Sequence, residues 1–338
     1  MTKISINLLR WSTPWEEVQQ CITAVLNSSF QSFELIYTEN LHPSAPSLID
    51  KVRQEFGQDN RLRTLRNEIN LGYAGAHNQF FAETDSELLM VLNPDAVIDR
   101  LFLENIITPF SDSKVGAVTG KMLKPRIPGN GAAVLDGTGI EIFRSRRARE
   151  RGQLETDHGQ YDHNRVVFGV SGTAAVYRKT ALEAVKIGDM EYFDPDFFAY
   201  WEDFDLSWRL RLCGFECVYV PQAVVEHVRA VGVSPGGLYN FGTFVKHHKS
   251  FPLWVRKWSW RNHLFAIIKN DFGWCLYRDL PQIVIREVAM LLFIAVFTPD
   301  TLLAVPKAVK LLSRMLEKRA LIQSSRTIDS SDICRFFK

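Results

Sequence analysis

Cysteine is scarce in this chain of 338 residues, which holds five, an odd number. Cys213 and Cys217 stand close together, but no second pair of Cys or His residues lies at the spacing of a zinc site. We therefore expect free thiols in a reducing cytosol rather than a disulfide framework or a zinc centre. The first residues lead directly into a strand-like run, which predicts no signal peptide.

A long uninterrupted apolar run is also missing. The most apolar stretch, residues 283–297, is interrupted by Arg286 and Glu287. Its uninterrupted part, residues 288–297, is far shorter than the roughly 20 residues that a transmembrane helix needs, so we expect no membrane span. DNA- and RNA-binding motifs are absent from the sequence as well, so nucleic acid is not an expected partner.

The charge is nearly balanced, at +2 overall, but it is unevenly distributed. Residues 251–338 contain 14 Lys and Arg against 7 Asp and Glu, so the remaining chain is acidic. A basic tail on an acidic body predicts an anionic surface as the partner of the tail.

The first part of the chain repeats a strand–helix order. Residues 3–9 alternate as a strand does, and Thr13 and Pro14 form a helix start before an apolar helical face. A strand at 33–37, a helix at 46–56 and a strand at 61–65 follow. This order predicts an α/β fold with a mixed, mainly parallel sheet flanked by helices, whose ligands lie beyond the carboxyl ends of the strands.

Polar residues follow two of these elements. Residues 70–78 form a small-residue loop that opens a helix and lets the backbone approach a phosphate or ribose closely. The buried strand at 87–92 ends at Asn93 and Asp95, whose oxygen atoms suit a magnesium ion that is also held by substrate phosphates. An ordinary turn is the alternative at both places.

Acidic and aromatic residues are most concentrated at 193–208. Carboxylates placed among aromatic rings need a cation, hydrogen bonds or a substrate. The spacing predicts a helix that begins at Glu202, with Asp203 in its first turn and Asp205 and Arg209 as an i,i+4 pair. The alternative is a set of acids that only complements the helix dipole.

Two basic regions complete the chain. Residues 125–162 are rich in glycine and hold five arginines at 144–151, and we expect a long, basic, mobile loop or hairpin over the ligand-binding edge of the sheet. A solvated charge run is the alternative there. Residues 302–318 form an amphipathic helical pattern that is typical of helices that bind in a membrane interface. Its apolar face consists of Leu302, Val305, Val309, Leu312, Met315 and Leu316, and the opposed basic row of Lys307, Lys310, Arg314 and Lys318.

We therefore divide the chain into a first domain, residues 1–240, and a helical, basic, amphipathic extension, residues 241–338. Membrane-interface attachment is the favoured role of the extension. Packing on the first domain or on a partner subunit is the alternative.

Four motifs occur in a fixed order along residues 3–240. They are Asn70-x-Gly72-Tyr73-Ala74-Gly75-x-x-Asn78, Leu92-Asn93-Pro94-Asp95, Phe197-Phe198-x-Tyr200-x-Glu202-Asp203-x-Asp205-Leu206-x-Trp208-Arg209 and His227-x-x-x-x-Gly232-x-Ser234. In order and spacing they resemble the family 2 glycosyltransferases of the GT-A fold. The resemblance is greatest to a bacterial rhamnosyltransferase-like branch that builds cell-surface polysaccharides.

The resemblance implies roles for the residues that match it. Asp95, with Asn93, matches the metal-binding position, and His227 matches a histidine that helps to hold the metal or the diphosphate; the cofactor implied is Mg²⁺ or Mn²⁺. Asp203 matches the general base, with Glu202 beside it in the catalytic pair.

Substrate-binding residues are implied in the same way. Residues expected to bind the donor nucleotide are Glu39, Asn70, Gly72, Asn78 and Asn93. Trp201 and Tyr200 stand where aromatic rings can stack on the acceptor sugar.

The function implied is that of an inverting glycosyltransferase of the hexosyltransferase class. It would move L-rhamnose from dTDP-rhamnose, a nucleotide-diphosphate sugar donor, to a hydroxyl of a saccharide or lipid-linked saccharide acceptor. The protein would then bind the surface of the cytoplasmic membrane and be located peripherally on its inner face. Assembly into a homo-oligomer is also possible under this interpretation.

Two alternatives remain open. The first is a non-catalytic sugar-nucleotide-binding or scaffold subunit of a polysaccharide assembly complex. The second is a nucleotidyltransferase, although no basic Gly-rich motif for a triphosphate is evident in the sequence.

Overall fold

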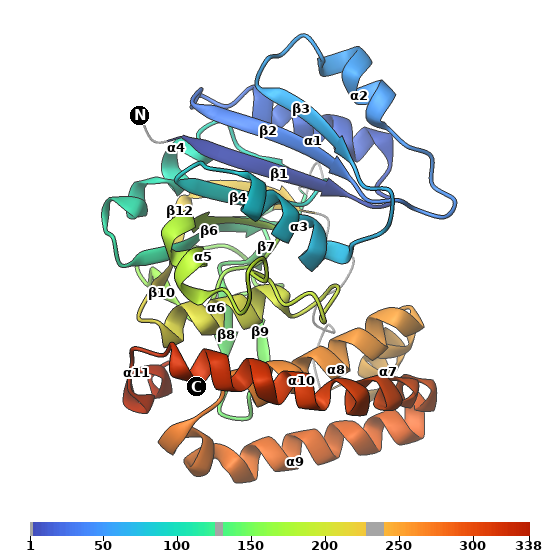
Figure 1. Ribbon diagram of the computed structural model, residues 1–338, viewed down its shortest axis with the longest axis vertical. Coiled ribbons are helices and arrows are strands. Elements are labelled where there is room, and N and C mark those ends of the chain that lie inside the picture. The colour runs from blue at the N-terminus through green and yellow to red at the C-terminus, as the bar shows by residue number, and fades with distance from the viewer. Residues whose placement is uncertain (1–2, 126–130, 228–239) are drawn as a thin grey trace.

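The computed structural model describes residues 3–125, 131–227 and 240–338 (Figure 1). Positions Gly232 and Ser234 of the fourth sequence motif lie outside these residues.

A parallel half-sheet is built by the first part of the chain, with strand order β3-β2-β1-β4. Helices connect these strands, as the strand–helix order of the sequence predicted. The elements are β1 (Ile4–Arg10), α1 (Trp15–Leu26), β2 (Phe33–Glu39), α2 (Ile49–Phe56), β3 (Leu62–Arg66), α3 (Gly72–Glu83) and β4 (Leu88–Leu92).

The sheet continues through β11, which is antiparallel to both β4 and β6, and through β12, which is parallel to β6. The sheet is therefore mixed and mainly parallel, which confirms the predicted fold class. The elements are β5 (Ala96–Ile98), α4 (Phe102–Ile106), η1 (Thr108–Ser111), β6 (Val115–Leu123), β7 (Leu135–Gly137), β10 (Val166–Val167), β11 (Ala174–Arg178), α5 (Lys179–Val185), α6 (Glu202–Leu212) and β12 (Glu216–His227).

The core has two halves, one on each face of the sheet. All five residues of β4 are buried, and they alternate between the two halves: Leu88 and Met90 belong to one cluster, and Leu89 and Val91 to the other. Side chains alternate along a strand, so a strand covered on both faces is a continuous apolar run. This burial fixes the sheet and leaves the polar residues at the strand ends for the site.

A layer of helices follows β12 along the chain, as predicted for the extension. Figure 1 shows this layer below the sheet, with α9 at the edge furthest from it. The elements are α7 (Phe241–Ser250), α8 (Leu253–Asn270), α9 (Gly273–Phe297), η3 (Pro299–Ala304), α10 (Val305–Ser324) and α11 (Ser330–Cys334). Helix α8 packs against both α6 and α10.

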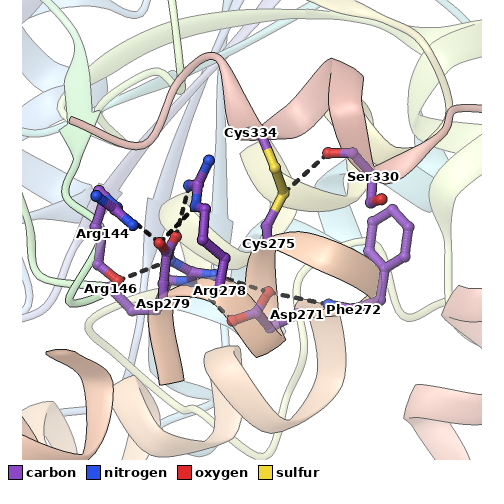
Figure 2. The surroundings of a disulfide bond; sticks show 9 residues. All are labelled: Arg144, Arg146, Asp271, Phe272, Cys275, Arg278, Asp279, Ser330 and Cys334. Carbon is purple, nitrogen blue, oxygen red and sulfur yellow. Dashed lines mark hydrogen bonds and ion pairs between the residues drawn. A yellow bond between two sulfur atoms is a disulfide. The ribbon is translucent and has the colours of Figure 1, made fainter. Parts of the chain in front are cut away.

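The arginine-rich stretch forms a hairpin, β8 (Ile140–Ile142) and β9 (Ala148–Glu150), that is anchored to the helical layer. Figure 2 shows Arg144 and Arg146 directed at Asp279. The guanidinium of Arg146 is fully buried and lies 2.7 Å from Asp271 and 2.9 Å from Asp279. Of the two predicted forms of this stretch, the hairpin is confirmed and the mobile loop is wrong for β8 and β9, because these carboxylates hold the arginine side chains in place.

The prediction that every cysteine is a free thiol is wrong for one pair. Cys275 of α9 and Cys334 of α11 form a disulfide (Figure 2), although 59 residues separate them in the chain. Cys21, Cys213 and Cys217 are free. The pair was missed because only the packing of α11 on α9 brings the two sulfurs together, and the cysteine-based argument for a reducing cytosol does not hold.

The expectation about the apolar stretch also needs correction. Helix α9 continues for 25 residues through Arg286 and Glu287, so it is about 38 Å long at 1.5 Å per residue. By length and composition it is the one helix among the described residues that is able to cross a membrane, and 11% of its most apolar stretch is buried. The sequence analysis treated Arg286 and Glu287 as the end of the apolar segment, whereas α9 continues through both residues.

The buried arginine of the hairpin generates the first prediction. Arg146→Met leaves Asp271 and Asp279 without their buried partner, and we expect the free energy of unfolding to fall by about 3–5 kcal/mol. Arg278→Met is the matched control, because Arg278 also pairs with Asp279 but is partly exposed, so its loss costs below about 1 kcal/mol. Urea unfolding of both variants is the measurement, and equal losses would contradict the anchoring role of Arg146.

Candidate functional site

Asp95 and His227 meet at the end of the sheet. His227 closes β12, where its register partner is Ala96 of β5, and its Nε2 lies 3.4 Å from Oδ2 of Asp95. The other ring nitrogen, Nδ1, lies 3.0 Å from Oδ2 of Asp136, a fully buried residue of β7. The carboxylate of Asp136 orients the ring, so that Nε2 and Asp95 face the same point.

This arrangement suits a divalent cation. A histidine whose second nitrogen is held by a carboxylate is the usual form of a metal-ligating histidine, and Asp95 adds a hard oxygen donor. Among the described residues no group of three or more His, Cys, Asp or Glu side chains is placed to hold a metal. Asp95 and His227 therefore offer two possible ligands to such an ion, and a metal site here stays a prediction.

Asp203 lies at the start of α6 with its carboxylate held from two sides. Its Oδ2 accepts a hydrogen bond of 2.8 Å from the Gly172 amide, and its Oδ1 accepts one of 2.7 Å from the Phe204 amide. The side chain is half-buried. It is therefore oriented by backbone donors and still reaches solvent.

Glu202, the neighbouring acid, is in a different environment. It is buried, and the pKa of its carboxyl is raised well above its ordinary value, first by burial and then by the charge of Asp203. Two adjacent acids whose environments separate their protonation states can take different roles. Glu202 therefore keeps its proton to a higher pH than an ordinary glutamic acid does.

The two acidic positions are linked through residues 171–173. The backbone amide of Asn93 donates to the Thr173 carbonyl at 2.8 Å, and the backbone amide of the adjacent Gly172 donates to the carboxylate of Asp203. Tyr73 of α3 donates to the Gly172 carbonyl at 2.5 Å from the other side. The Asn93–Asp95 turn and the carboxylate of Asp203 are thus held on one short segment that leads into β11.

A strained loop precedes the catalytic pair. Phe198, Tyr200 and Trp201 have φ values of 66°, 71° and 74°, in the left-handed region that side-chain-bearing residues rarely adopt. Asn262 of α8, which is fully buried, donates through Nδ2 to the carbonyls of Phe197, Ala199 and Tyr200 at 2.9–3.0 Å. Asn262 was missed by the sequence analysis, because nothing near it in the chain points to a contact 60 residues upstream.

The two aromatic residues expected at the acceptor site point toward the helical layer. Trp201 donates from Nε1 to Ser259 at 3.0 Å and packs its ring on His263. The Tyr200 ring lies 6.0 Å from that of Trp254. Sugar stacking on Trp201 or Tyr200 stays a prediction.

Several residues expected to bind the donor nucleotide have partners within the chain. Asn78 exchanges two hydrogen bonds with the backbone of Phe193, at 2.7 and 2.8 Å. Asn70 accepts from the Gly72 amide at 2.9 Å. Gly72 has a φ of +70°, and a Cβ there would lie 2.5 Å from the Phe198 carbonyl oxygen, so this glycine permits close packing on the strained loop.

Glu39 is also enclosed by the chain. Its carboxylate accepts hydrogen bonds from Arg10, Tyr37, Ser47 and the Leu48 amide. Burial alone would raise the pKa of Glu39, but these hydrogen bonds, that of Ser47 foremost, outweigh it and lower the pKa. A contact of Glu39 with a nucleotide base stays a prediction and would require exchange of one of these partners. Asn93 stands two residues before Asp95, and its contact with the donor also stays a prediction.

The other acids of the 193–208 stretch are structural. Asp194 is fully buried and lies 2.5 Å from both Lys269 and Lys318, and Lys269 also lies 2.9 Å from Asp205. Burial alone would raise the pKa of Asp194, but the two lysines outweigh it and hold the pKa well below its usual range. The cations that this stretch requires therefore come from α8 and α10.

Comparisons with known proteins agree with this fold. The family model described as glycosyl transferase family 2 matches residues 12–186. A poly-β-1,6-N-acetyl-D-glucosamine synthase of Staphylococcus epidermidis is 27% identical over 210 residues, which cover 62% of this chain and 46% of that protein. The chain therefore spans about half the length of the curated relatives that it matches.

Solved structures share the architecture at low sequence identity. TarS residues 1–349 of S. aureus match with a TM-score of 0.54 and 13% identity, over 96% of this chain and 89% of that chain. The mannosyltransferase PcManGT of Pyrobaculum calidifontis, solved with GDP-Man and Mn²⁺, matches with a TM-score of 0.52 and 12% identity, over 96% and 85%. These likenesses support the fold.

The raised pKa of Glu202 generates a prediction about stability and pH. Since its folded-state pKa lies above the unfolded value, the folded state binds more protons, and the free energy of unfolding falls as pH rises from the unfolded toward the folded pKa. Glu202→Gln removes this dependence, so the stability of the variant relative to the unsubstituted chain should grow with pH, by at most about 1.4 kcal/mol per unit. Urea unfolding at pH 5 to 8 is the measurement, and a constant difference would contradict a raised pKa of Glu202.

Proposed function

Because this chain belongs to the family 2 glycosyltransferases, of the GT-A fold, we propose that it transfers a sugar from a nucleoside-diphosphate donor to a hydroxyl of a saccharide or lipid-linked saccharide, with inversion at the anomeric carbon. The observation that carries this proposal is the placement of Asp203, which is oriented by two amides beside the turn that bears Asp95.

Asp203 is the general base of the proposed reaction. Its partly exposed carboxylate takes the proton of the acceptor hydroxyl as that oxygen forms a bond to the anomeric carbon. The bond between that carbon and the diphosphate oxygen breaks with its electron pair moving to the diphosphate, so a single displacement inverts the centre. Glu202 is buried beside the base, and its raised pKa opposes a second negative charge there.

Asp95 and His227 would hold a Mg²⁺ or Mn²⁺ ion, with Asp136 fixing the ring of His227. When bound, the ion stabilises the negative charge of the departing diphosphate. The structure of PcManGT with Mn²⁺ supports a divalent ion in a related fold.

The nucleotide sugar is the finer part of the proposal. S. aureus TarS has been solved in complex with UDP-GlcNAc, and the curated relative reported above is a poly-N-acetylglucosamine synthase. These names favour UDP-GlcNAc as the first donor to test. L-rhamnose from dTDP-rhamnose, implied by the resemblance, has no support from those proteins and stays a second candidate.

We propose that the extension, residues 241–338, attaches to the cytoplasmic face of a membrane. Large apolar side chains are exposed along its outer helices, among them Val284 and Val288 of α9 and Leu303, Val309 and Leu316 of η3 and α10. An exposed apolar surface of this kind marks a membrane or protein contact. Two of the expected face residues differ, because Met315 is buried and Lys318 pairs with Asp194.

The alternative function, a non-catalytic subunit, is separated from the enzyme by donor turnover. Release of nucleoside diphosphate from a panel of nucleotide sugars supports the enzyme, and binding without release supports the subunit. The retained arrangement of Asp95, Asp203 and His227 favours the enzyme.

Asp203→Asn should lower turnover by about 100-fold or more while donor binding survives, because the amide cannot accept the acceptor proton. Glu202→Gln is the matched control, since it replaces the neighbouring carboxyl by an amide and should cost less than about tenfold. Nucleoside diphosphate release is the measurement. Near-normal turnover of Asp203→Asn would remove Asp203 from the role of base.

Asp136→Asn should weaken Mn²⁺ affinity by about 10–100-fold, because His227 loses the carboxylate that orients it. Asp157→Asn is the control, since the carboxylate of Asp157 pairs with Lys121. Titration of Mn²⁺ in the presence of UDP measures both, and equal affinities of the two variants would contradict the assignment.

Val309→Glu should reduce binding to anionic vesicles at least fivefold, because it places a charge in the apolar surface. Gln54→Glu, on the exposed face of α2, adds the same charge away from the extension. Vesicle co-sedimentation of the full chain is the measurement, and a loss that is the same in both variants would argue against the surface.

A further inference from the structure

A large apolar cavity lies between α7, α8 and α9. Its volume is about 830 Å³, in the range of pockets that hold a whole small ligand. Phe244 of α7, Trp260 of α8 and Met290 and Phe293 of α9 supply much of its lining. Trp201 forms part of one wall, so the cavity begins at the residue that directly precedes the catalytic pair.

Helix α9 is anchored at its ends and stands away from the body between them. The disulfide and the Arg146–Asp279 pair hold its first turns (Figure 2), and Ile294 is buried near its other end. Ile285, which lines the cavity, is 69% exposed. Apolar walls that are held apart in this way gain free energy when hydrocarbon replaces water between them.

The rim of the cavity carries positive charge. Arg256 and Arg286 line it and pair with Asp300 and Glu287. Arg147, from the hairpin, lines it too, and within residues 3–125, 131–227 and 240–338 no carboxylate lies at ion-pair distance from its guanidinium. The surrounding protein atoms, and then the charges of Arg149 and Arg286, lower the pKa of Arg147, so a bound anion would be favoured there.

Two of the histidines that line the cavity, His248 and His263, add no positive charge to it at pH 7. Burial, followed by the charges of Arg256 and His247, lowers the pKa of His248 to about 4, and burial holds the pKa of His263 well below its ordinary value. Both are neutral at pH 7. The cavity therefore combines apolar walls with the guanidinium of Arg147, which lines it.

We propose that this cavity binds the hydrocarbon chain of a membrane lipid whose phosphate group lies against Arg147, and that this lipid carries the acceptor hydroxyl. The opposite face of α9, which includes Leu291, is exposed and apolar, so a chain can pass from a bilayer to the cavity over apolar surface. The phosphate position at the hairpin and the chain beside Trp201 would direct the head of the lipid toward Asp203.

The identification of the lipid as acceptor rests on the proposed function, but the binding does not. Lipid binding is measured without donor, and donor turnover is measured separately, with saccharide and lipid-linked saccharide acceptors present. Failure of the first with release of nucleoside diphosphate intact would overturn this inference alone, and failure of the second alone would overturn the proposed function.

The test uses the purified full chain and three probes in equilibrium dialysis: farnesyl phosphate, farnesol and inorganic phosphate. We expect saturable binding of one farnesyl phosphate per chain, at least tenfold tighter than farnesol, and no saturable binding of inorganic phosphate. Geranyl phosphate, one isoprene unit shorter, should bind roughly tenfold more weakly, since less apolar surface is buried. Equal affinities for farnesyl and geranyl phosphate, or for farnesyl phosphate and farnesol, would overturn the proposal.

Two pairs of variants locate the site. Ala289→Trp fills the cavity from the middle of α9 and should weaken farnesyl phosphate binding at least tenfold, whereas Leu291→Trp adds the same ring to the opposite face and should change it less than twofold. Arg147→Gln should remove the preference for the phosphate, and Arg149→Gln, on the same hairpin but outside the lining, should keep it. Equal effects within either pair would contradict the site.

Discussion

The orientation of Asp203 depends on a backbone that would not hold its shape alone. Three residues of the 198–201 loop adopt left-handed φ values, and each costs on the order of 1–2 kcal/mol for a residue with a side chain. The loop persists because Asn262 donates to two of its carbonyls and to that of Phe197, and because Ser259 holds Trp201, both from α8. On the other side the Ala74 amide donates to the Phe198 carbonyl, and Gly72 makes room for this approach.

The helical layer is therefore part of the framework of the candidate active site as well as a candidate membrane contact. Arg146 reaches from the hairpin to α9, and Lys269 and Lys318 reach from α8 and α10 to Asp194. Buried pairs of this kind add little net stability over apolar packing, but losing one partner is costly. The division at residue 240 is thus a proposal about sequence organisation, since the two parts share these buried contacts.

The sequence was sufficient for the features that are local. The alternation of β4, the turn at Asp95 and the helix that begins at Glu202 each follow from residues that are neighbours in the chain. Asp136, Asn262 and the Cys275–Cys334 pair were missed, because their roles arise from contacts across 59 residues or more. The acids of the 193–208 stretch were expected to need a cation, hydrogen bonds or a substrate, and only the fold shows that Lys269 and Lys318 are the cations beside Asp194.

The most direct test of this account is amide hydrogen exchange over residues 197–204, compared between the unsubstituted chain and Asn262→Ala, with Gln323→Ala as the control. Gln323 donates to carbonyls of Lys269 and Asn270, away from the loop. The account predicts slow exchange of the loop in the unsubstituted chain and in the control, and fast exchange in Asn262→Ala while α8 itself stays protected. Equal protection of the loop with and without Asn262 would contradict the claim that α8 holds the catalytic backbone.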